Sequence, residues 1–121
     1  MKTIHVGTDR PYDILIGGGL LDQAGPLCRA ALPKAGKLAV ITDSTVAPLY
    51  LTRVRASLEH SGFQVLCHTV PTGESSKNPQ QLADLWEALM TFGLTRTDAV
   101  AALGGGVVGD LAGFAAATIL R

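Results

Sequence analysis

The sequence predicts a single α/β domain over residues 1–121, with a mostly parallel sheet, helices on both of its faces and an N-terminal β-hairpin. Short apolar runs of strand length alternate with helical patterns at close intervals, which is the order of βαβ units. The 121 residues leave room for one domain, since a domain usually holds roughly 100–200. Hydrophobic residues make up 47% and charged residues 17%, a balance that supports a buried core.

Charge and cysteine usage narrow the class of protein. Ten Lys and Arg residues balance ten Asp and Glu residues, so the chain has no electrostatic footprint for nucleic acid or an anionic membrane. It shows no secretory signal and no apolar run of the roughly 18–20 residues that a membrane span needs. Cys28 and Cys67 lie far apart in no metal-ligand spacing, and the three histidines are scattered. We therefore expect two reduced thiols in a cytoplasmic protein, with a disulfide between them left open.

The first third of the chain predicts a hairpin, a helical segment and a buried strand. Residues 3–6 and 12–16 are typical of short strands joined by a turn. Residues 20–32 are helical in composition, but Pro26 must either break this helix or begin a second one. Residues 38–42 (LAVIT) form a continuous apolar run, which indicates a strand buried on both faces of a parallel sheet.

The middle of the chain predicts two further helices around a strand at 63–70. The first helix is capped by residues 43–45 and ends near Gly62. We expect four apolar side chains on its inner side: Val46, Leu49, Val54 and Leu58. The second begins with Asn78 as its N-cap and Pro79 in its first turn, and it ends at Gly93. Its apolar stripe follows a helical period and contains Leu82, Leu85, Trp86 and Leu89, so we interpret Trp86 as core and not as a ligand platform.

The last third contains the sharpest motif of the chain. A predicted buried strand at 99–103 leads directly into Gly104, Gly105 and Gly106, and Gly109 completes a G-x-G-x-x-G before an apolar helix at 107–120. Glycines at a helix start let a phosphate approach the backbone N–H groups closely. The alternative is a tight turn in which glycine supplies a positive φ. The strand before the motif and the helix after it favour phosphate binding, and with it a Rossmann-like fold, although the motif stands at the far end of the chain and not in the first βα turn.

Two other segments carry polar groups at strand ends. Asp43 follows the LAVIT strand, where it could accept hydrogen bonds from the hydroxyls of an adenosine ribose and repel a 2′-phosphate, or serve only as a helix cap. The segment VPTGESSKNP carries Glu74 and Lys77, which could reach ribose hydroxyls and a phosphate. A solvated loop with a weak ion pair is the alternative for this segment.

Together and in this order, the three segments resemble the 3-dehydroquinate synthase family. The matching stretches are ITDSTV, PTGESSKN and ALGGGVVGDLAGFAAATILR. The resemblance covers essentially the whole chain but only the N-terminal, NAD-binding domain of the family. Thr45 stands where asparagine is common, and Ile119 where an aromatic residue is common.

The resemblance implies a set of NAD-binding residues and one substrate residue. Asp43 would bind the adenosine ribose, Glu74 and Lys77 the ribose and neighbouring groups, and Asp110 would lie near the nicotinamide ribose. The implied cofactor-binding set is Asp43, Thr45, Thr72, Gly73, Glu74, Ser75, Ser76, Lys77, Gly105, Gly106, Val107, Val108, Gly109 and Asp110. Arg121 would reach the substrate phosphate, across a dimer interface.

The resemblance also implies an activity. The family converts 3-deoxy-D-arabino-heptulosonate 7-phosphate to 3-dehydroquinate and phosphate in the shikimate pathway, with recycled NAD and a divalent metal, zinc or cobalt. The family's metal ligands and most of its substrate lysines lie in a C-terminal domain, so we expect this chain to be a fragment that holds no catalytic residue, binds NAD weakly and is inactive alone. The apolar helix near its end predicts self-association or a homodimer.

Three alternatives remain open. Another sugar-phosphate cyclase, such as 2-deoxy-scyllo-inosose synthase, would share the NAD domain and close a different ring. An enzyme like glycerol dehydrogenase would use NAD as a co-substrate, so that NADH accumulates. A non-catalytic nucleotide-binding or oligomerisation module would have no metal-binding part.

Overall fold

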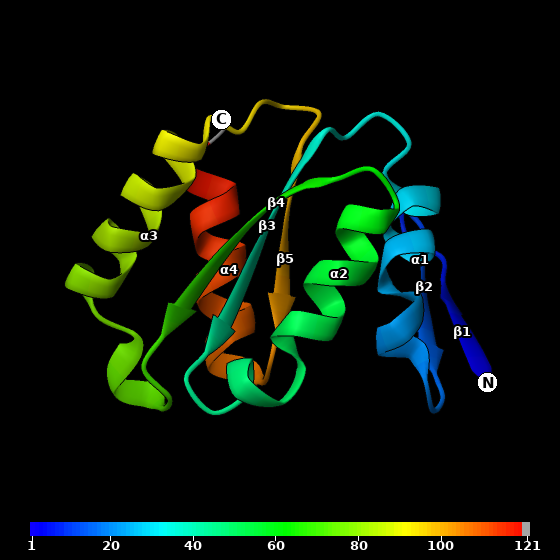
Figure 1. The fold of residues 1–121 in the computed structure, drawn as a ribbon, viewed down its shortest axis with the longest axis horizontal. Coiled ribbons are helices and arrows are strands. Elements are labelled where there is room, and N and C mark those ends of the chain that lie inside the picture. The colour runs from blue at the N-terminus through cyan, green and yellow to red at the C-terminus, as the bar shows by residue number, and fades with distance from the viewer. Residues whose placement is uncertain (120–121) are drawn as a thin grey trace.

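The computed structural model describes residues 1–119 and has the expected α/β architecture (Figure 1). Its strands are β1 (Lys2–Val6), β2 (Tyr12–Ile16), β3 (Lys37–Asp43), β4 (Gln64–Val70) and β5 (Ala99–Leu103). Its α-helices are α1 (Ala24–Ala31), α2 (Thr52–His60), α3 (Pro79–Phe92) and α4 (Gly106–Ile119). Short helical turns precede three of them, at Leu20–Gln23, Ala47–Leu51 and Glu74–Ser76.

Strands β3, β4 and β5 form a parallel sheet in the order β4-β3-β5, as the apolar runs predict. The central strand β3 is buried along its length, and its side chains alternate between two cores. Leu38 and Val40 pack into the core under α1 and α2, whereas Ala39 and Ile41 pack into the core under α3 and α4. The sheet is thus covered on both faces (Figure 1).

The strand order creates a switch point at the carboxyl edge of the sheet. The chain leaves β3 through α2 on one face, returns through α3 on the other, and leaves β5 through α4 on that second face. Because β3 and β5 are neighbours and the helices that follow them lie on opposite faces of the sheet, the chain diverges between these two strand ends. Open α/β sheets bind their ligands in a crevice at such a point.

Strands β1 and β2 pair as the expected antiparallel hairpin, with Lys2 opposite Ile16 and Val6 opposite Tyr12. They form a separate two-stranded sheet, drawn in blue in Figure 1. Several of their apolar side chains are exposed, among them Ile4, Ile14 and Ile16. The hairpin therefore contributes little to either core.

Two expectations about burial are wrong. Leu49 is 61% exposed instead of facing the core. The segment Ala47–Leu51 is a wide π-helical turn, so the side-chain period before α2 differs from that of an α-helix, while Val54 and Leu58 are buried as expected. Strand β5 is only half-buried, because it lies at an edge of the sheet.

The helix boundaries follow the predicted capping signals. Asn78 Oδ1 accepts a hydrogen bond from the Gln81 N–H at 2.9 Å, and Gly93 ends α3 with φ 78°, a left-handed conformation that glycine adopts without strain. Pro26 stands in the first turn of α1, so the second of its two expected roles is confirmed. Gly62 follows α2 with its N–H donating to Glu59 O.

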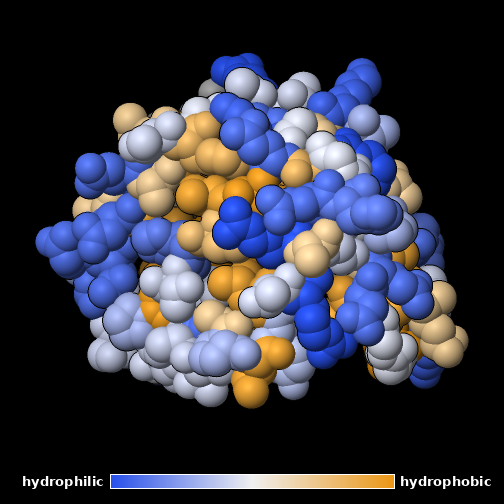
Figure 2. Space-filling model, viewed as in Figure 1, coloured by the Kyte–Doolittle hydropathy of each residue, from blue (hydrophilic) through white to orange (hydrophobic). Residues whose placement is uncertain are grey.

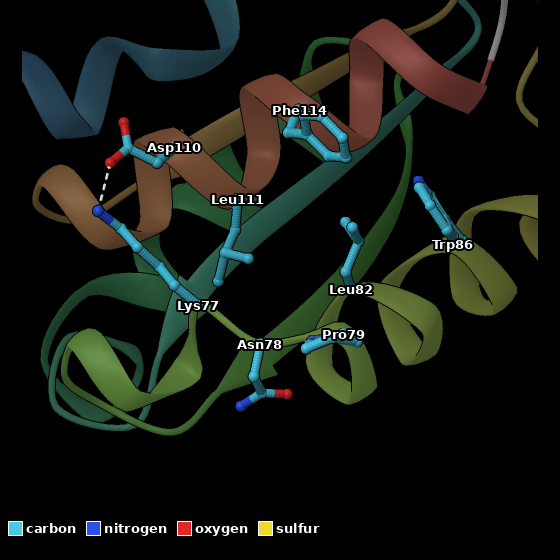
Figure 3. A pocket seen from close by; sticks show the side chains of 8 residues that line it. All are labelled: Lys77, Asn78, Pro79, Leu82, Trp86, Asp110, Leu111 and Phe114. Carbon is cyan, nitrogen blue, oxygen red and sulfur yellow. Dashed lines mark ion pairs between the residues drawn. The ribbon is translucent and has the colours of Figure 1, made fainter.

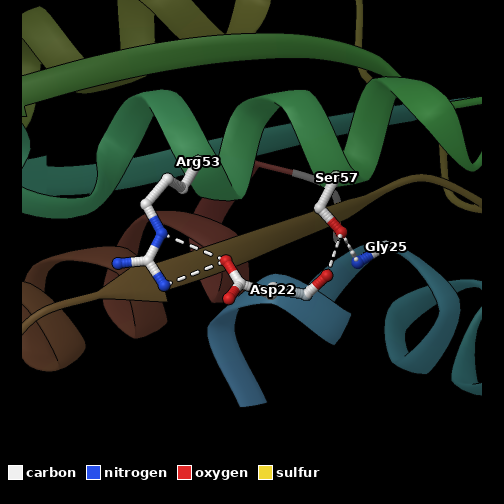
Figure 4. Close-up of polar contacts among 4 residues, drawn as sticks. All are labelled: Asp22, Gly25, Arg53 and Ser57. Carbon is white, nitrogen blue, oxygen red and sulfur yellow. Dashed lines mark hydrogen bonds and ion pairs between the residues drawn. The ribbon is translucent and has the colours of Figure 1, made fainter. Parts of the chain in front are cut away.

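Helices α1 and α2 pack closely at Gly25 (Figure 4). The Gly25 N–H donates to Ser57 Oγ at 2.8 Å, and this hydroxyl donates in turn to Asp22 O at 3.1 Å. Arg53 adds a two-pronged contact with Asp22 Oδ1, at 3.0 and 2.9 Å. A Cβ atom on Gly25 would overlap the carbonyl oxygen of Ser57 and lie 2.6 Å from its carbonyl carbon. Only glycine fits this helix crossing.

Asp98 joins the loop before β5 to the loop before β3 at the opposite, amino-terminal edge of the sheet. Its Oδ1 accepts from Lys37 N at 2.9 Å and Gly36 N at 3.1 Å, and its Oδ2 accepts from Thr95 N at 2.8 Å and the Thr95 hydroxyl at 3.1 Å. Burial alone would raise the pKa of Asp98, but these donors outweigh it and hold the pKa below the ordinary value of 3.8.

Replacing Asp98 with asparagine should lower the free energy of unfolding at neutral pH by about 1–2 kcal/mol, because an amide NH2 group cannot accept the Thr95 N–H. The folded-state pKa is depressed, so the ionised carboxylate stabilises the fold above pH 3.8 and this contribution disappears as the pH falls through the lower folded value. The difference between the two proteins should therefore shrink below pH 3.8. Urea unfolding at neutral and strongly acidic pH measures it. Asp9→Asn, in the exposed hairpin turn, is the matched control, and equal stability of D98N and parent at neutral pH would contradict the assignment.

Candidate functional site

The loops that follow β3, β4 and β5 meet at the carboxyl edge of the sheet, at the bottom of Figure 1. They carry the three segments that the sequence singles out. The registers bring their starting points together, because Asp43 pairs with Val70 of β4 and Thr42 pairs with Leu103 of β5. The buried Thr42 hydroxyl also donates to Leu103 O at 2.8 Å, which ties β3 to β5 beside the crevice.

The glycine turn after β5 is uncovered. Gly104 has φ 154° and its position for a Cβ lies 3.0 Å from Val108 Cγ2, so this first glycine is needed for backbone conformation and packing. Cβ atoms on Gly105 and Gly106 would meet no protein atom within 4 Å. The backbone there is open to a ligand and is not covered by side chains.

Helix α4 presents unpaired donors at this turn. Its first i→i−4 hydrogen bond runs from Gly109 N to Gly105 O at 3.0 Å. The N–H groups of Gly106, Val107 and Val108 precede this bond in the first helical turn, where no intrahelical acceptor exists. These N–H groups and the positive end of the helix dipole favour an anion.

Asp43 caps the turn that follows β3. Its Oδ1 accepts from Thr45 N at 2.9 Å and from Val46 N at 2.8 Å, so the capping interpretation is confirmed. These two bonds use one carboxylate oxygen and leave the lone pairs of the other for a ligand. The ribose interpretation is therefore compatible with the cap, because the two roles use different oxygens.

Three hydroxyls join the loop after β3 to the loop after β4. Thr72 Oγ1 lies 2.9 Å from Ser44 Oγ and 2.7 Å from Thr45 Oγ1, and it accepts the Thr45 N–H at 3.0 Å. The Thr72 N–H donates back to Ser44 Oγ at 3.1 Å. The sequence interpretation placed Ser44 only among the capping groups. Ser44 and Thr45 follow β3, and Thr72 follows the neighbouring strand β4. Hydroxyl residues after two neighbouring strands are the sequence signal that could have indicated this contact.

Lys77 joins the loop after β4 to α4. Its Nζ lies 2.7 Å from Asp110 Oδ2 and 3.2 Å from Glu74 Oε2, so the ion pair expected within the loop is present and extends to a second element. The hydrogen bonds to Asp110 and then to Glu74 raise the pKa of Lys77 above its ordinary value. All three carboxylate and ammonium groups are accessible to solvent.

The side chains and N–H groups of the predicted residue set differ in their surroundings. The Ser76 side chain is buried and its hydroxyl donates to Pro71 O, and the Val108 side chain is buried in the core, so neither side chain faces a ligand. The Gly109 N–H donates to Gly105 O at 3.0 Å. Gly73 and Ser75 lie exposed in the loop with Thr72 and Glu74. Arg121 lies outside the described residues.

A groove of about 520 Å3 extends from the Lys77–Asp110 pair between α3 and α4 (Figure 3). Its apolar wall includes Leu82, Trp86 and Phe114. Trp86 is half-buried and packs against the core, and its Nε1–H donates to Thr118 Oγ1 at 2.8 Å. Its ring also stacks on the ring of Phe114 in the groove wall, with the ring centroids 6.4 Å apart. The interpretation of Trp86 as core is therefore only partly correct. Phe114 is 54% exposed, so α4 does present an uncovered apolar side chain.

The described part of the chain was also searched for metal ligands, reactive thiols and membrane spans. Residues 1–119 contain no group of three His, Cys, Asp or Glu side chains that could hold a metal ion. Both thiols are free and half-buried, and burial raises the pKa of each. Among the described helices, none combines the length and apolar character that a membrane span requires. The face in Figure 2 shows hydrophobic surface over its centre, where β4 forms the front edge of the sheet between α2 and α3.

Comparison with solved structures supports the Rossmann-like assignment. The fold is similar to that of a 2-deoxy-scyllo-inosose synthase solved with carbaglucose-6-phosphate, NAD+ and Co2+, with a TM-score of 0.83 at 22% identity over 98% of this chain and 32% of that one. It is also similar to the 2-epi-5-epi-valiolone synthase of Streptomyces hygroscopicus with NAD+ and Zn2+ bound, with a TM-score of 0.72 at 27% identity over 95% of this chain and 31% of that one.

Comparison by sequence shows which proteins the chain is similar to. Residues 67–121 match the family described as 3-dehydroquinate synthase N-terminal. The chain is 48% identical to the 3-dehydroquinate synthase of Symbiobacterium thermophilum over 118 residues, which are 98% of this chain and 33% of that protein. The chain thus spans about a third of the length of the curated relatives that it matches. By its sequence, the chain is similar to the 3-dehydroquinate synthase N-terminal family over residues 67–121 and to curated 3-dehydroquinate synthases over almost its whole length.

Proposed function

We propose that this chain is the NAD-binding part of a 3-dehydroquinate synthase, which converts 3-deoxy-D-arabino-heptulosonate 7-phosphate to 3-dehydroquinate and phosphate. One observation carries the proposal. Uncovered backbone at Gly105 and Gly106, with three unpaired N–H groups behind it, lies across the switch point from the Asp43 carboxylate. Anion donors and a ribose acceptor on the two sides of one crevice suit a dinucleotide.

The residues at this edge suit the separate parts of NAD. The first turn of α4 would hold the pyrophosphate, and Asp43 would accept from the adenosine ribose. Glu74, Lys77 and Asp110 would contact the ribose hydroxyls and the charged groups between them. When bound, NAD supplies a hydride acceptor that is regenerated within the same turnover. The described residues position and orient this cofactor and contribute no acid, base or nucleophile to the reaction.

The divalent metal does not fit the described residues, because they hold no cluster of ligands for it. We assign the metal, zinc or cobalt, and most substrate contacts to the two thirds of the relatives' length that this chain does not span. Arg121 as a substrate-phosphate ligand, the cytoplasmic location and the association of copies through α4 remain predictions. The experiment that tests this chain is therefore cofactor binding and not turnover.

Sequence identity separates the first alternative from the proposal. The chain is 48% identical to a 3-dehydroquinate synthase but only 22% identical to the 2-deoxy-scyllo-inosose synthase, so the second likeness supports the fold alone. A dehydrogenase that consumes NAD would accumulate NADH in a full-length protein, whereas the proposed synthase would not.

Replacing Asp43 with asparagine should reduce the preference for NAD over NADP. An asparagine Oδ1 still accepts the N–H groups of Thr45 and Val46, so the fold should be retained. Loss of the charge weakens the hydrogen bond to ribose and removes the repulsion of a 2′-phosphate, so NAD affinity should fall about tenfold while NADP affinity falls less or rises. Isothermal titration calorimetry with both nucleotides measures the two affinities.

The matched control is Asp84→Asn on α3, where the carboxylate accepts from Gln80 Nε2 at 2.9 Å and lies away from the loops after β3 and β5. Its NAD affinity should equal that of the parent. An unchanged ratio of NAD to NADP affinity in the Asp43→Asn protein would refute the ribose role. Failure of the parent chain to bind NAD at millimolar concentrations would refute the proposed function itself.

A further inference from the structure

Strand β4 forms one edge of the three-stranded sheet, and half of its backbone groups point away from β3 (Figure 1). At its start, the Gln64 N–H donates to Gly36 O at 2.9 Å. At its end, Val70 O accepts from the Ser44 N–H at 2.9 Å. In a parallel pair, alternate residues direct both backbone groups to the same neighbour, so the even-numbered residues of β4 bond to β3. The residues whose N–H and C=O groups point to the open edge are Val65, Cys67 and Thr69.

An acidic groove of about 570 Å3 lies between β4 and α3. Its apolar surface includes Leu66 of β4 and Phe92 of α3, and its charged groups are the exposed carboxylates of Asp84 and Glu87. No Lys or Arg is among the described residues that line it. Burial outweighs the opposing effect of Asp84 and lowers the pKa of the neighbouring His68 below its ordinary value of 6.5, so this imidazole is neutral at neutral pH. The groove therefore carries negative charge.

This charge decides which kind of chain suits the open edge of β4. Two copies paired edge to edge and antiparallel would form one continuous sheet with both α3 helices on the same face. Asp84 and Glu87 of one copy would then face those of the other, which is unfavourable. A basic strand would instead place alternate side chains against these carboxylates, and the methylene stems of lysines would cover Leu66 and Phe92.

The open edge of β5 differs in charge. The pocket beside it is lined by Arg10 and Arg96, with Asp98 already accepting four hydrogen bonds from the loops around it. A basic segment is therefore attracted to β4 and not to β5. The two edges of the same sheet thus differ in the partner that they favour.

We propose that the open edge of β4 and the acidic groove beside it bind an extended basic polypeptide segment, which adds a fourth strand to the parallel sheet. Its backbone would bond to the outward N–H and C=O groups of β4, and its Lys or Arg side chains, two residues apart, would lie against Asp84 and Glu87. The inference is independent of the proposed nucleotide-binding function, because none of these residues lies in the loops that follow β3, β4 and β5.

The test uses three capped peptides of seven residues, titrated into the 15N-labelled chain and followed by NMR. The first alternates valine and lysine, the second has glutamate in place of lysine, and the third is the first with N-methylated backbone nitrogens. The valine–lysine peptide should bind, and it should shift and protect from exchange the amides of Val65, Cys67 and Thr69, while those of Ala99–Leu103 in β5 stay unchanged. The other two peptides should bind at least about tenfold more weakly, because one lacks the charge complementarity and the other the backbone donors.

Glu87→Gln removes one groove charge and keeps the side-chain shape. This variant should bind the valine–lysine peptide about two- to fivefold more weakly, the value of an exposed ion pair. Asp9→Asn makes the same change of net charge in the hairpin turn and should bind like the parent.

Several results would overturn the proposal. The first is no binding of the valine–lysine peptide at millimolar concentration. Equal binding of the N-methylated peptide would exclude strand addition, and equal binding of the glutamate peptide would exclude a role for the acidic groove. Protection of β5 or hairpin amides in place of those of β4, or equal losses in Glu87→Gln and Asp9→Asn, would place the peptide elsewhere.

Discussion

Replacing Gly25 with alanine should lower the free energy of unfolding by about 3 kcal/mol, the largest effect expected of a single methyl group in this chain. The added Cβ overlaps the backbone carbonyl of Ser57, which cannot rotate away as a side chain would. Helix α1 must therefore move from α2, and the Gly25 N–H bond to Ser57 Oγ at 2.8 Å would be lost or lengthened. The intrinsic preference of alanine for helices, about 1 kcal/mol, offsets only part of this cost. Urea unfolding followed by circular dichroism measures the difference.

Gly113→Ala supplies the matched control. Gly113 also lies within a helix, but a Cβ there would meet no atom within 4 Å. That substitution should stabilise the chain by about 0.5–1 kcal/mol, because it lowers the conformational entropy of the unfolded state at no steric cost. If the Gly25→Ala protein were as stable as the Gly113→Ala protein, the close packing of α1 on α2 would be wrong.

Replacing Gly106 with valine should abolish most NAD binding while leaving the fold intact. The space around a Cβ at Gly106 holds no protein atom, and the residue begins α4 with a φ that L-residues adopt. The valine side chain would instead occupy the space where a pyrophosphate approaches the backbone N–H groups. Losing one charge-assisted hydrogen bond, about 1.5–3 kcal/mol, corresponds to a roughly ten- to hundredfold weaker affinity.

The same substitution at Gly7 is the control. Gly7 lies next to the hairpin turn, and a Cβ there would also meet no atom within 4 Å. Gly7→Val should bind NAD like the parent chain in a calorimetric titration, and the urea midpoints of both variants should stay close to the parent value. Unchanged NAD affinity in the Gly106→Val protein would show that the turn does not hold the dinucleotide.

Local patterns in the sequence were sufficient to predict the elements of the fold. The apolar run LAVIT, the Asn78 cap and Gly93 each report on a few neighbouring residues, because hydrophobic period and capping depend on local geometry. The exceptions share a physical cause. The exposure of Leu49 follows from a π-helical turn, and the half-burial of β5 follows from its place in the sheet; neither has a distinct local signal.

The residues of the site also divide into those that local sequence patterns predict and those that depend on contacts between distant segments. The glycine turn and Asp43 could be predicted, since a strand end followed by glycine or a carboxylate is a pattern along the chain. The cross-links could not, because Ser44 meets Thr72 across 28 residues, and Lys77 reaches an aspartate on a different helix. The buried hydroxyl of Ser76 also depends on how its loop folds back onto Pro71.

The sequence by itself determined which segments become strands and helices, where the helices begin and end, and that glycine-rich backbone follows the last strand. The tertiary structure alone decided that β5 lies beside β3, so that the loops after them begin at neighbouring strand ends, and that Gly25 must have no side chain. The reason is that backbone preferences act over a few residues. Strand order, helix crossings and shared hydrogen bonds depend instead on how distant segments fill the space between them.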